Sequence, residues 1–303
     1  MKHYIRWCIP TLLMVAFSGS AAVYPVCPPP PVPGVFVDDL GRTVDIEEVP
    51  QRIVSLAPSN TEILFALGLG NKVVGVTEFC NYPETALDIE KVGGWLPFDL
   101  ERVVALEPDL VLAAALHERK GIPALERVDI TVFALVPKTL NEVLSNITLV
   151  GEITGKSEKA IRLVTDLEDR IRAITEKTMT LTDEQRPRVL YIVWHDPLLV
   201  AGSGTFADDL INKAGGKNIA YDLTQWAGID LETVIARNPQ LIIAPHRAAG
   251  VKDKLRLGLG VTDAFRENRV YLVEEDLFDR PGPRLVDALE ELTKFIHPEL
   301  FGE

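Results

Sequence analysis

Short apolar runs alternate with amphipathic stretches through the first third of the chain. Arg52-Ile-Val-Ser-Leu-Ala57 and Val73-Val-Gly-Val76 are two such runs, and a third apolar stretch, residues 63–67, lies between them. Short apolar runs favour strands that are buried in a parallel sheet. The order strand, loop, helix, strand predicts an α/β lobe. Residues 35–46 precede it and predict a hairpin, because turn residues separate two β-rich runs.

The helix at residues 63–67 has start and stop signals on either side. Ser59 or Asn60 is expected to cap its first turn, since both side chains can accept from free backbone N–H groups. Glu62 suits the positive end of the helix, and Gly68 suits its end.

The pattern of residues 95–113 recurs at residues 226–244, with nine of nineteen positions identical in register. Each copy has a Trp, an Asp suited to cap a helix, apolar residues at helical spacing, a Pro that stops the helix and an apolar strand. A repeat at this distance is too long for a solenoid, whose periods are about 20–50 residues. It therefore indicates two similar lobes. The capping residues are Asp99 and Asp230, and the prolines are Pro108 and Pro239.

Residues 139–178 carry apolar side chains at spacings of three and four, with charged residues between them. This pattern predicts a short helix followed by a long helix over residues 157–178. A long helix in the middle of the chain can join the two lobes and resist large hinge motion. Strands at residues 188–194 and 270–273 and a closing helix at residues 284–295 complete the second lobe.

The first 34 residues are expected to serve export. Lys2, His3 and Arg6 precede an uncharged run that ends in small residues, as in a secretory signal. A proline-rich spacer follows. The expected segments are a signal at 1–22, a spacer at 23–34, an N-terminal lobe at 35–137, a linking helical segment at 138–180 and a C-terminal lobe at 181–303.

Two cysteines outside the signal leave several interpretations open. Cys27 and Cys80 can pair in an oxidising compartment, or Cys27 can carry a lipid anchor. Cys80 as a small buried apolar residue is the simpler interpretation. An uncleaved N-terminal anchor is the further alternative, so the protein is expected to be periplasmic or cell-surface, with or without an anchor.

The charge of the chain excludes one class of partner. The 303 residues carry a formal net charge of −13. Nucleic-acid-binding proteins present basic faces, so nucleic acid is not an expected ligand.

Three tryptophans are the main candidates for ligand contact. Trp194 and His195 end a predicted strand, and Trp95 and Trp226 lie in predicted loops before the repeated helices. Ligands of parallel α/β sheets bind beyond the carboxyl ends of the strands. A lone Trp is more often a core residue, but two in register across lobes favour an aromatic-lined cleft.

Enzymatic and metal sites are less well supported. Gly202-Ser-Gly204 precedes a helix but lacks the Lys of a phosphate-binding loop. His117, His195 and His246 offer no ligand pair on one helix face, and are interpreted as surface or loop residues. No nucleophile elbow of the Gly-x-Ser-x-Gly type is present. The protein is therefore not expected to be an enzyme or to hold a cofactor or metal.

Glu101 and Glu232 occupy equivalent positions at the start of the repeated helices. A carboxylate near a helix N-terminus is stabilised by about 0.3–1 kcal/mol, which explains an acidic residue there. It does not explain the match between lobes. A matched pair of carboxylates suits docking onto basic residues of a two-subunit partner.

Residues 52–295 resemble the helical-backbone class of substrate-binding proteins of ABC importers, which bind cobalamin, ferric siderophores or haem. The resemblance rests on Arg52-Ile-Val-Ser-Leu-Ala-Pro-Ser-Asn-Thr-Glu, on Asp99-Leu-Glu-Arg-Val-Val-Ala-Leu-Glu-Pro-Asp-Leu-Val and on Phe278-Asp-Arg-Pro-Gly-Pro-Arg284. It implies an α/β fold of two Rossmann-like lobes with parallel sheets, joined by a single long α-helix. It also implies a monomer that serves an ABC permease dimer with its ATPase subunits.

Within this class the chain is most similar to cobalamin-binding proteins. The similarity implies that Glu101 and Glu232 dock on permease arginines, and that cobalamin or a related corrinoid is the transported ligand. One departure is that the family has a Trp soon after its Pro-Asp-Leu-Val strand, where this chain has Ala113-Ala-Ala-Leu116. The ligand-contacting residues implied are Tyr82, Trp95, Trp194, Trp226, Asp276, Phe278 and Arg280.

Two other ligands of the same class remain open. A ferric siderophore would require cleft arginines, for which Arg280, Arg284 and Arg247 are candidates. Haem would require an axial ligand, for which Tyr82 or His195 is a candidate. An exported metal-dependent enzyme with the same lobes is the competing class of function.

Overall fold

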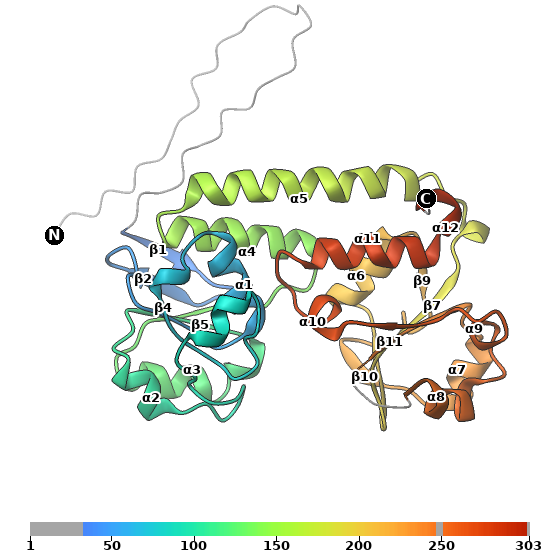
Figure 1. Cartoon of the computed structure of the whole chain (residues 1–303), viewed down its shortest axis with the longest axis horizontal. Coiled ribbons are helices and arrows are strands. Elements are labelled where there is room, and N and C mark those ends of the chain that lie inside the picture. The colour runs from blue at the N-terminus through green and yellow to red at the C-terminus, as the bar shows by residue number, and fades with distance from the viewer. Residues whose placement is uncertain (1–32, 247–250, 302–303) are drawn as a thin grey trace, which may run out of the picture.

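The computed structural model describes residues 33–246 and 251–301, which form two lobes joined by helices (Figure 1). The predicted signal, most of the spacer, Cys27 and Arg247 lie outside the described residues. Among the residues described, no helix has both the length and the apolar character needed to cross a membrane.

The N-terminal lobe is built as its sequence predicts. Strands β1 and β2 form an antiparallel hairpin in which Phe36 pairs with Val44. The lobe's main sheet has four parallel strands in the order β4-β3-β5-β6. The strands are β1 Gly34–Val37, β2 Thr43–Ile46, β3 Ile53–Ser55, β4 Val73–Val76, β5 Leu110–Ala113 and β6 Val132–Ala134. The helices are α1 Pro58–Ala66, α2 Leu100–Ala105 and α3 Gly121–Glu126.

Helix α1 begins earlier than predicted. Its N-cap is Ala57 and Pro58 is its first residue, so Ser59 and Asn60 lie within the first turn and neither caps the helix. Proline suits this position because the first N–H groups of a helix have no intrahelical partner. Asn60 instead donates from Nδ2 to the Ala113 carbonyl at 2.9 Å, which ties α1 to β5. Gly68 follows the helix with φ of +72°, as its predicted role requires.

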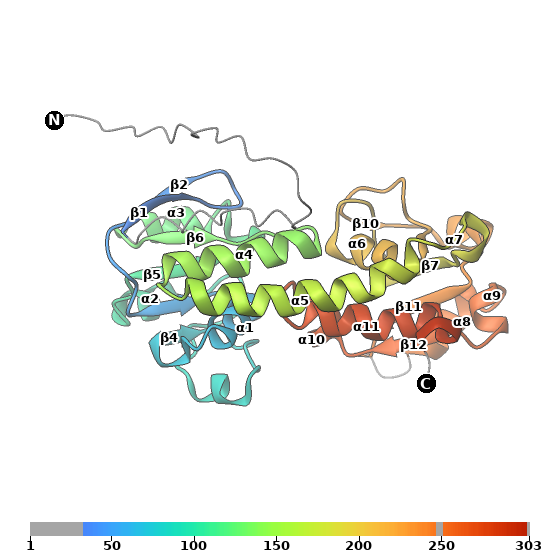
Figure 2. The same ribbon diagram turned by 90° about the horizontal axis from the view of Figure 1, so that it is seen from above.

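A helical segment connects the lobes, and its longer helix spans both of them (Figure 1). Helices α4, Leu140–Ile153, and α5, Ser157–Thr178, confirm the predicted helical segment. Helix α5 runs across both lobes in both views (Figures 1 and 2). Arg170 of α5 forms ion pairs with Asp287 and Glu290 of α11, Leu285–Ile296.

The sheet of the C-terminal lobe is mixed rather than parallel. Strands β7, β11 and β12 are parallel, but β8 and β10 run antiparallel to their neighbours in the order β10-β8-β7-β11-β12. Only residues 196 and 197 separate β7 from β8, and a parallel crossover needs a dozen or more. A hairpin is therefore required. The strands are β7 Arg188–His195, β8 Leu198–Ala201, β9 Lys217–Asn218, β10 Trp226–Gly228, β11 Leu241–Pro245 and β12 Val270–Val273.

The remaining helices cover this sheet or close the chain. Helix α7 repeats the capped helix of α2, as the sequence repeat predicts, and Asp230 caps it through a bond from the Thr233 N–H of 2.7 Å. The helices are α6 Phe206–Lys213, α7 Leu231–Arg237, α8 Val251–Leu259, α9 Asp263–Arg266, α10 Glu275–Phe278 and α12 Pro298–Phe301.

One hydrophobic cluster continues through both lobes. It joins Leu64 of α1, Ile147 of α4, Ile171 of α5 and Leu289 of α11, which are all buried. Because the cluster is shared, the lobes are held together by burial of apolar surface as well as by the chain connection. The predicted α/β class and helical connection are therefore confirmed. The prediction of a parallel sheet is wrong for the C-terminal lobe, whose sheet is mixed.

Candidate ligand-binding cleft

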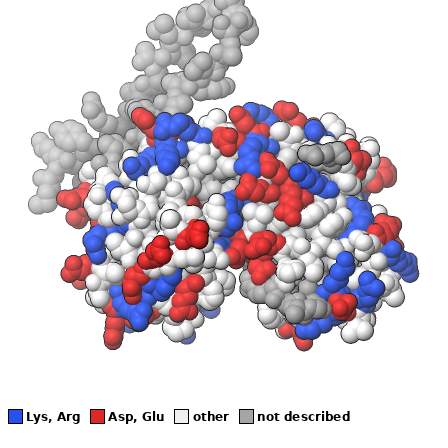
Figure 3. All heavy atoms as spheres, viewed as in Figure 1, with Lys and Arg blue, Asp and Glu red and all other residues white. Residues whose placement is uncertain are grey.

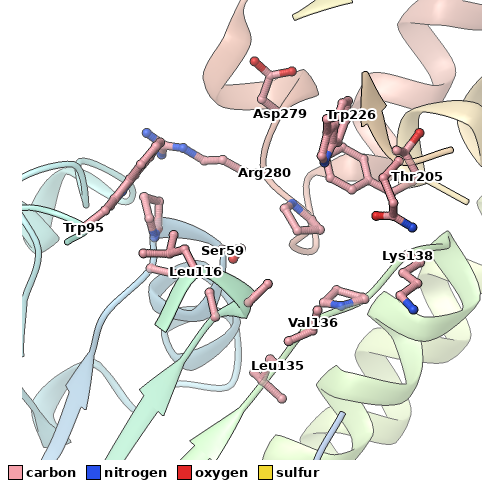
Figure 4. A pocket seen from close by; sticks show the side chains of 18 of the residues that line it. Ser59, Trp95, Leu116, Leu135, Val136, Lys138, Thr205, Trp226, Asp279 and Arg280 are labelled. Carbon is pink, nitrogen blue, oxygen red and sulfur yellow. The ribbon is translucent and has the colours of Figure 1, made fainter. Parts of the chain in front are cut away.

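A cleft of about 300 Å³ lies between the two lobes. The N-terminal lobe contributes segments that follow β3, β5 and β6, so the cleft lies at the carboxyl ends of these strands, as expected for an α/β sheet. The C-terminal lobe contributes the segment at Gly204–Phe206, the β10 edge and the segment at Asp279–Pro281. Figure 4 shows Trp95 and Trp226 on opposite sides of this space, with Arg280 between them.

Trp95 forms the wall on the N-terminal lobe. Its side chain is 43% exposed, and its ring centroid lies 4.7 Å from that of Phe79. Its carbonyl oxygen lies 2.9 Å from Nε2 of His117. Trp95 thus has a supported position together with a free ring surface, which is what an aromatic binding wall needs.

Trp226 forms the wall on the C-terminal lobe. It lies in the edge strand β10 and not in a loop, which corrects the sequence prediction. Its ring meets that of Phe206 edge-on at 5.3 Å, and its side chain is 41% exposed. Strand β10 exists because Trp226 pairs with Ala201 across the antiparallel ladder, a pairing that needs the hairpin described above.

Two of the predicted aromatic contacts do not line the cleft. Trp194 is 42% exposed, but its Nε1 donates to the Asp196 carbonyl at 2.7 Å and its ring lies against His195. The ring of Tyr82 covers the guanidinium of Arg284 at 3.8 Å. The structure therefore brings together Trp95, Trp226 and Arg280, and leaves Trp194 and Tyr82 outside this group.

A charged cluster joins the lobes beside the cleft. Glu62 of α1, only 2% exposed at its side chain, accepts from Arg284 Nε at 3.0 Å and Nη2 at 2.6 Å, and from Arg280 Nη1 at 3.3 Å. Arg280 also pairs with Asp276 at 2.6 Å. Asn81 bonds to both Asp276 and Arg280 at 2.7 Å. We call these five residues the interlobe cluster.

The interlobe cluster balances its own charges, since it contains two arginines and two carboxylates. The pKa of Arg284 is raised: its burial acts in the lowering direction, but the hydrogen bond and charge of Glu62 outweigh it. The role of Glu62 as the partner of these arginines is not predicted from the sequence. The available signal is a Glu directly before the apolar run of residues 63–67, since a carboxylate that is buried with such a run needs a cation.

Asp276, Arg280 and Phe278, which are all predicted to contact the ligand, lie in different surroundings in the structure. Arg280 lines the cleft, whereas Asp276 is bonded within the interlobe cluster and is not part of the lining. Phe278 is fully buried in the shared hydrophobic cluster and does not line the cleft. The short helix α10 turns Phe278 inward while Arg280, two residues later, reaches the cleft.

The histidines are not arranged as metal ligands. His117 is fully buried, which contradicts its interpretation as a surface or loop residue. Burial lowers the pKa of His117, although hydrogen bonds to the Trp95 and Ala114 backbone act in the opposite direction. Within residues 33–246 and 251–301, no group of three or more His, Cys, Asp or Glu side chains is placed to hold a metal ion. Cys80 is buried next to the hydroxyls of Thr61 and Thr77.

Glu101 and Glu232 are both exposed at the second position of their helices. Helices α2 and α7 lie on the side of the molecule away from α5 (Figure 1). Acidic and basic side chains are interspersed over the face seen in Figure 3. The structure thus presents one carboxylate from each lobe on the same side of the molecule.

Comparisons with known proteins agree with this geometry. The sequence profile of a family described as periplasmic binding protein matches residues 53–277. An uncharacterized ABC transporter substrate-binding lipoprotein of Bacillus subtilis strain 168 is 37% identical over 278 residues, which covers 89% of this chain and 87% of the relative.

Solved structures share the fold at lower identity. The periplasmic vitamin B12 binding protein of Vibrio cholerae superposes with a TM-score of 0.74 at 26% identity, over 83% of this chain and 98% of that one. A periplasmic heme-binding protein from Roseiflexus sp. RS-1 also gives a TM-score of 0.74, at 28% identity, over 82% of this chain and 98% of that one. The two similarities have the same strength, so they do not distinguish the ligand.

Proposed function

This chain belongs to the periplasmic binding protein family, and we propose that its cleft captures a corrinoid for delivery to an ABC permease. It is an ABC-type substrate-binding protein of the cobalamin, siderophore and haem class. The observation that carries the proposal is the pair of tryptophans, Trp95 and Trp226, which face one cleft from different lobes. Aromatic side chains from two lobes can cover the faces or edges of a large planar ligand.

The cleft chemistry favours a corrinoid over haem. The described lining contains no His, Tyr, Met or Cys, so it offers haem iron none of the common axial ligands. The two residues considered for that role, Tyr82 and His195, lie outside the lining. A cobalamin carries its own axial ligands and needs only contacts to its rim and side-chain amides. Trp95, Trp226, Gln225 and the backbone of the lining can supply these contacts.

The charge of the cleft also disfavours an anionic ferric siderophore. Arg280 lines the cleft but is paired with Asp276 and Glu62, and Arg284 is paired with Glu62. An anionic chelate would have to compete with these carboxylates for the guanidinium groups. A corrinoid such as cyanocobalamin is neutral overall, and so needs no such exchange. Lys138 is the exposed cation of the lining that favours the anionic alternatives.

Calorimetric titration of the mature protein with cyanocobalamin, haemin and ferrichrome tests the ligand. We expect one-to-one binding of cyanocobalamin. Replacement of both Trp95 and Trp226 by Ala should weaken it by at least tenfold, about 1.4 kcal/mol, since both ring walls are lost. Trp194→Ala is the matched control, because this ring is equally exposed but lies outside the cleft. Binding of haemin or ferrichrome without binding of cyanocobalamin would contradict the corrinoid proposal.

We further propose that Glu101 and Glu232 dock the protein on basic residues of a two-subunit permease, with its ATPase subunits. Replacement of both by Gln should leave ligand binding unchanged and abolish transport, measured as uptake of labelled cobalamin by cells. The control is the same double replacement at Glu158 and Glu176, which are exposed on α5 on the other side of the molecule. Normal uptake in the Glu101/Glu232 variant would contradict the docking proposal.

The proposed site of action is outside the cytoplasm, where a monomer cycles between ligand and permease. The Bacillus subtilis relative is named a lipoprotein, and Cys27 is the candidate anchor here. Mass spectrometry of the exported protein distinguishes a lipid on Cys27 from simple cleavage after residue 22. Bound zinc or manganese in the purified protein would support the competing class, an exported metal-dependent enzyme.

A further inference from the structure

We infer that His117 is a positioning residue that fixes the Trp95 wall of the cleft against the segment after β5. The inference rests on the proposed function only in treating this wall as a ligand surface. The placement of Trp95 by His117 is a property of the protein without ligand.

His117 bonds to both segments at once. Its Nε2 lies 2.9 Å from the Trp95 carbonyl oxygen, and its Nδ1 lies 3.0 Å from the Ala114 backbone nitrogen. The edge of the Phe98 ring meets the imidazole at 6.0 Å between centroids. The side chain is fully buried, so water does not compete for these bonds. Ala114, Ala115, Leu116 and Trp95 all line the cleft, and one imidazole joins them.

The partners define the tautomer. A backbone N–H can only donate, so Nδ1 of His117 accepts from Ala114 and carries no proton. A carbonyl oxygen can only accept, so Nε2 carries the proton and donates to Trp95. Protonation of Nδ1 would leave the Ala114 N–H facing another donor. Nδ1 could then donate only to the Ala114 carbonyl, 3.2 Å away, while Nε2 would still donate to the Trp95 carbonyl.

The bond from the Ala114 N–H to His117 is therefore sensitive to acid. The charged side chains on the elements around His117 are exposed: Asp99 after the Trp95 loop, Glu118, Arg119 and Lys120 after the turn, and Glu126 at the end of α3. Because burial lowers the pKa of His117 from its ordinary value of about 6.5, the ring is neutral at pH 7. This bond should persist as the pH falls past 6.5 and be lost as the pH passes the lower pKa of His117 in the folded protein.

Fluorine NMR of protein labelled with 5-fluorotryptophan tests the inference without ligand. The mature chain has three tryptophans, Trp95, Trp194 and Trp226, so three resonances are expected. His117→Leu removes both bonds and should shift or broaden the Trp95 resonance while the other two stay in place. His117→Gln can still donate to the Trp95 carbonyl and should restore the Trp95 resonance. His297→Leu is the control, since His297 is buried in the other lobe and bonds to the Gly215 carbonyl.

An acid titration of the wild type keeps the test decisive even if His117→Leu does not fold. The Trp95 resonance should shift alone below about pH 6.5, and this shift should be absent in His117→Gln. A Trp95 resonance that does not respond to acid before the protein unfolds would overturn the inference. So would an unchanged resonance in folded His117→Leu.

Cyanocobalamin binding supplies the functional measurement. His117→Leu should weaken it about tenfold at pH 7, and His117→Gln should recover most of the loss. If cyanocobalamin does not bind the wild type, the proposed ligand is wrong. The fluorine spectra still decide the role of His117 in that case, so the two failures are distinguishable.

Discussion

Replacement of Glu62 by Gln should destabilise the whole protein, because this side chain joins the lobes through buried charge. Glu62 is 2% exposed at its side chain and receives three hydrogen bonds from Arg280 and Arg284, at 2.6 to 3.3 Å. Glu62 lies in the N-terminal lobe, and the two arginines lie more than 200 positions later, in the C-terminal lobe. The variant keeps the volume of the side chain but removes its charge and turns an N–H₂ group towards a guanidinium.

The expected loss of stability depends on the partners that each arginine keeps in the variant. Removal of one partner of a buried ion pair costs about 3–5 kcal/mol. Arg280 keeps its ion pair with Asp276, so its loss is partial. Arg284 keeps only the Asp276 carbonyl at 3.3 Å and the face of Tyr82, but it is 22% exposed and can recover some hydration. We therefore expect a loss near the lower limit, about 3 kcal/mol.

Urea denaturation followed by circular dichroism measures this loss. With a denaturant dependence of about 3 kcal/mol per molar, the midpoint should fall by about 1 M. Glu126→Gln is the matched control: Glu126 also accepts from an arginine, Arg42, at 2.6 Å, but is 53% exposed, so its loss should be at most about 1 kcal/mol. Equal losses in the two variants would refute the argument that burial makes the interlobe cluster stabilising.

Three further predictions concern the cleft and its support. Phe278→Ala should lower the free energy of unfolding by about 3–5 kcal/mol in urea denaturation, because Phe278 is a core residue, while the folded protein keeps its ligand affinity. A loss of affinity with normal stability would show instead that Phe278 contacts the ligand. Gly202→Ala should weaken ligand binding and lower the melting temperature, because its Cβ would lie 2.5 Å from the Leu223 carbonyl oxygen and 2.8 Å from that of Gln225; unchanged affinity by calorimetry would show that the strand beside Trp226 can adjust. Lys138→Ala should leave cyanocobalamin binding unchanged at both low and high salt, because this ligand is neutral overall; a large calorimetric loss at low salt would favour an anionic ligand.

The sequence by itself determined the elements whose signals are local. The repeated Asp residues cap α2 and α7, as Asp99 and Asp230 were expected to do, because a capping bond joins residues three apart. The long helix α5 has the predicted bounds, because its apolar spacing is unbroken over 22 residues. Trp95 and Trp226 were expected to share a cleft because of the repeat, and the structure places both in its lining.

Only the tertiary structure decided which residues meet across the lobes. Its local sequence predicts a helix-dipole role for Glu62, but its arginine partners lie 218 and 222 positions away. No local pattern specifies a contact at that separation. The sequence around His117 predicts a surface or loop residue, because nothing near it in sequence reveals its contact with the Trp95 carbonyl. The antiparallel direction of β8 and β10 is not predicted, because an apolar run indicates a strand but not its direction. Packing and loop length determine that direction.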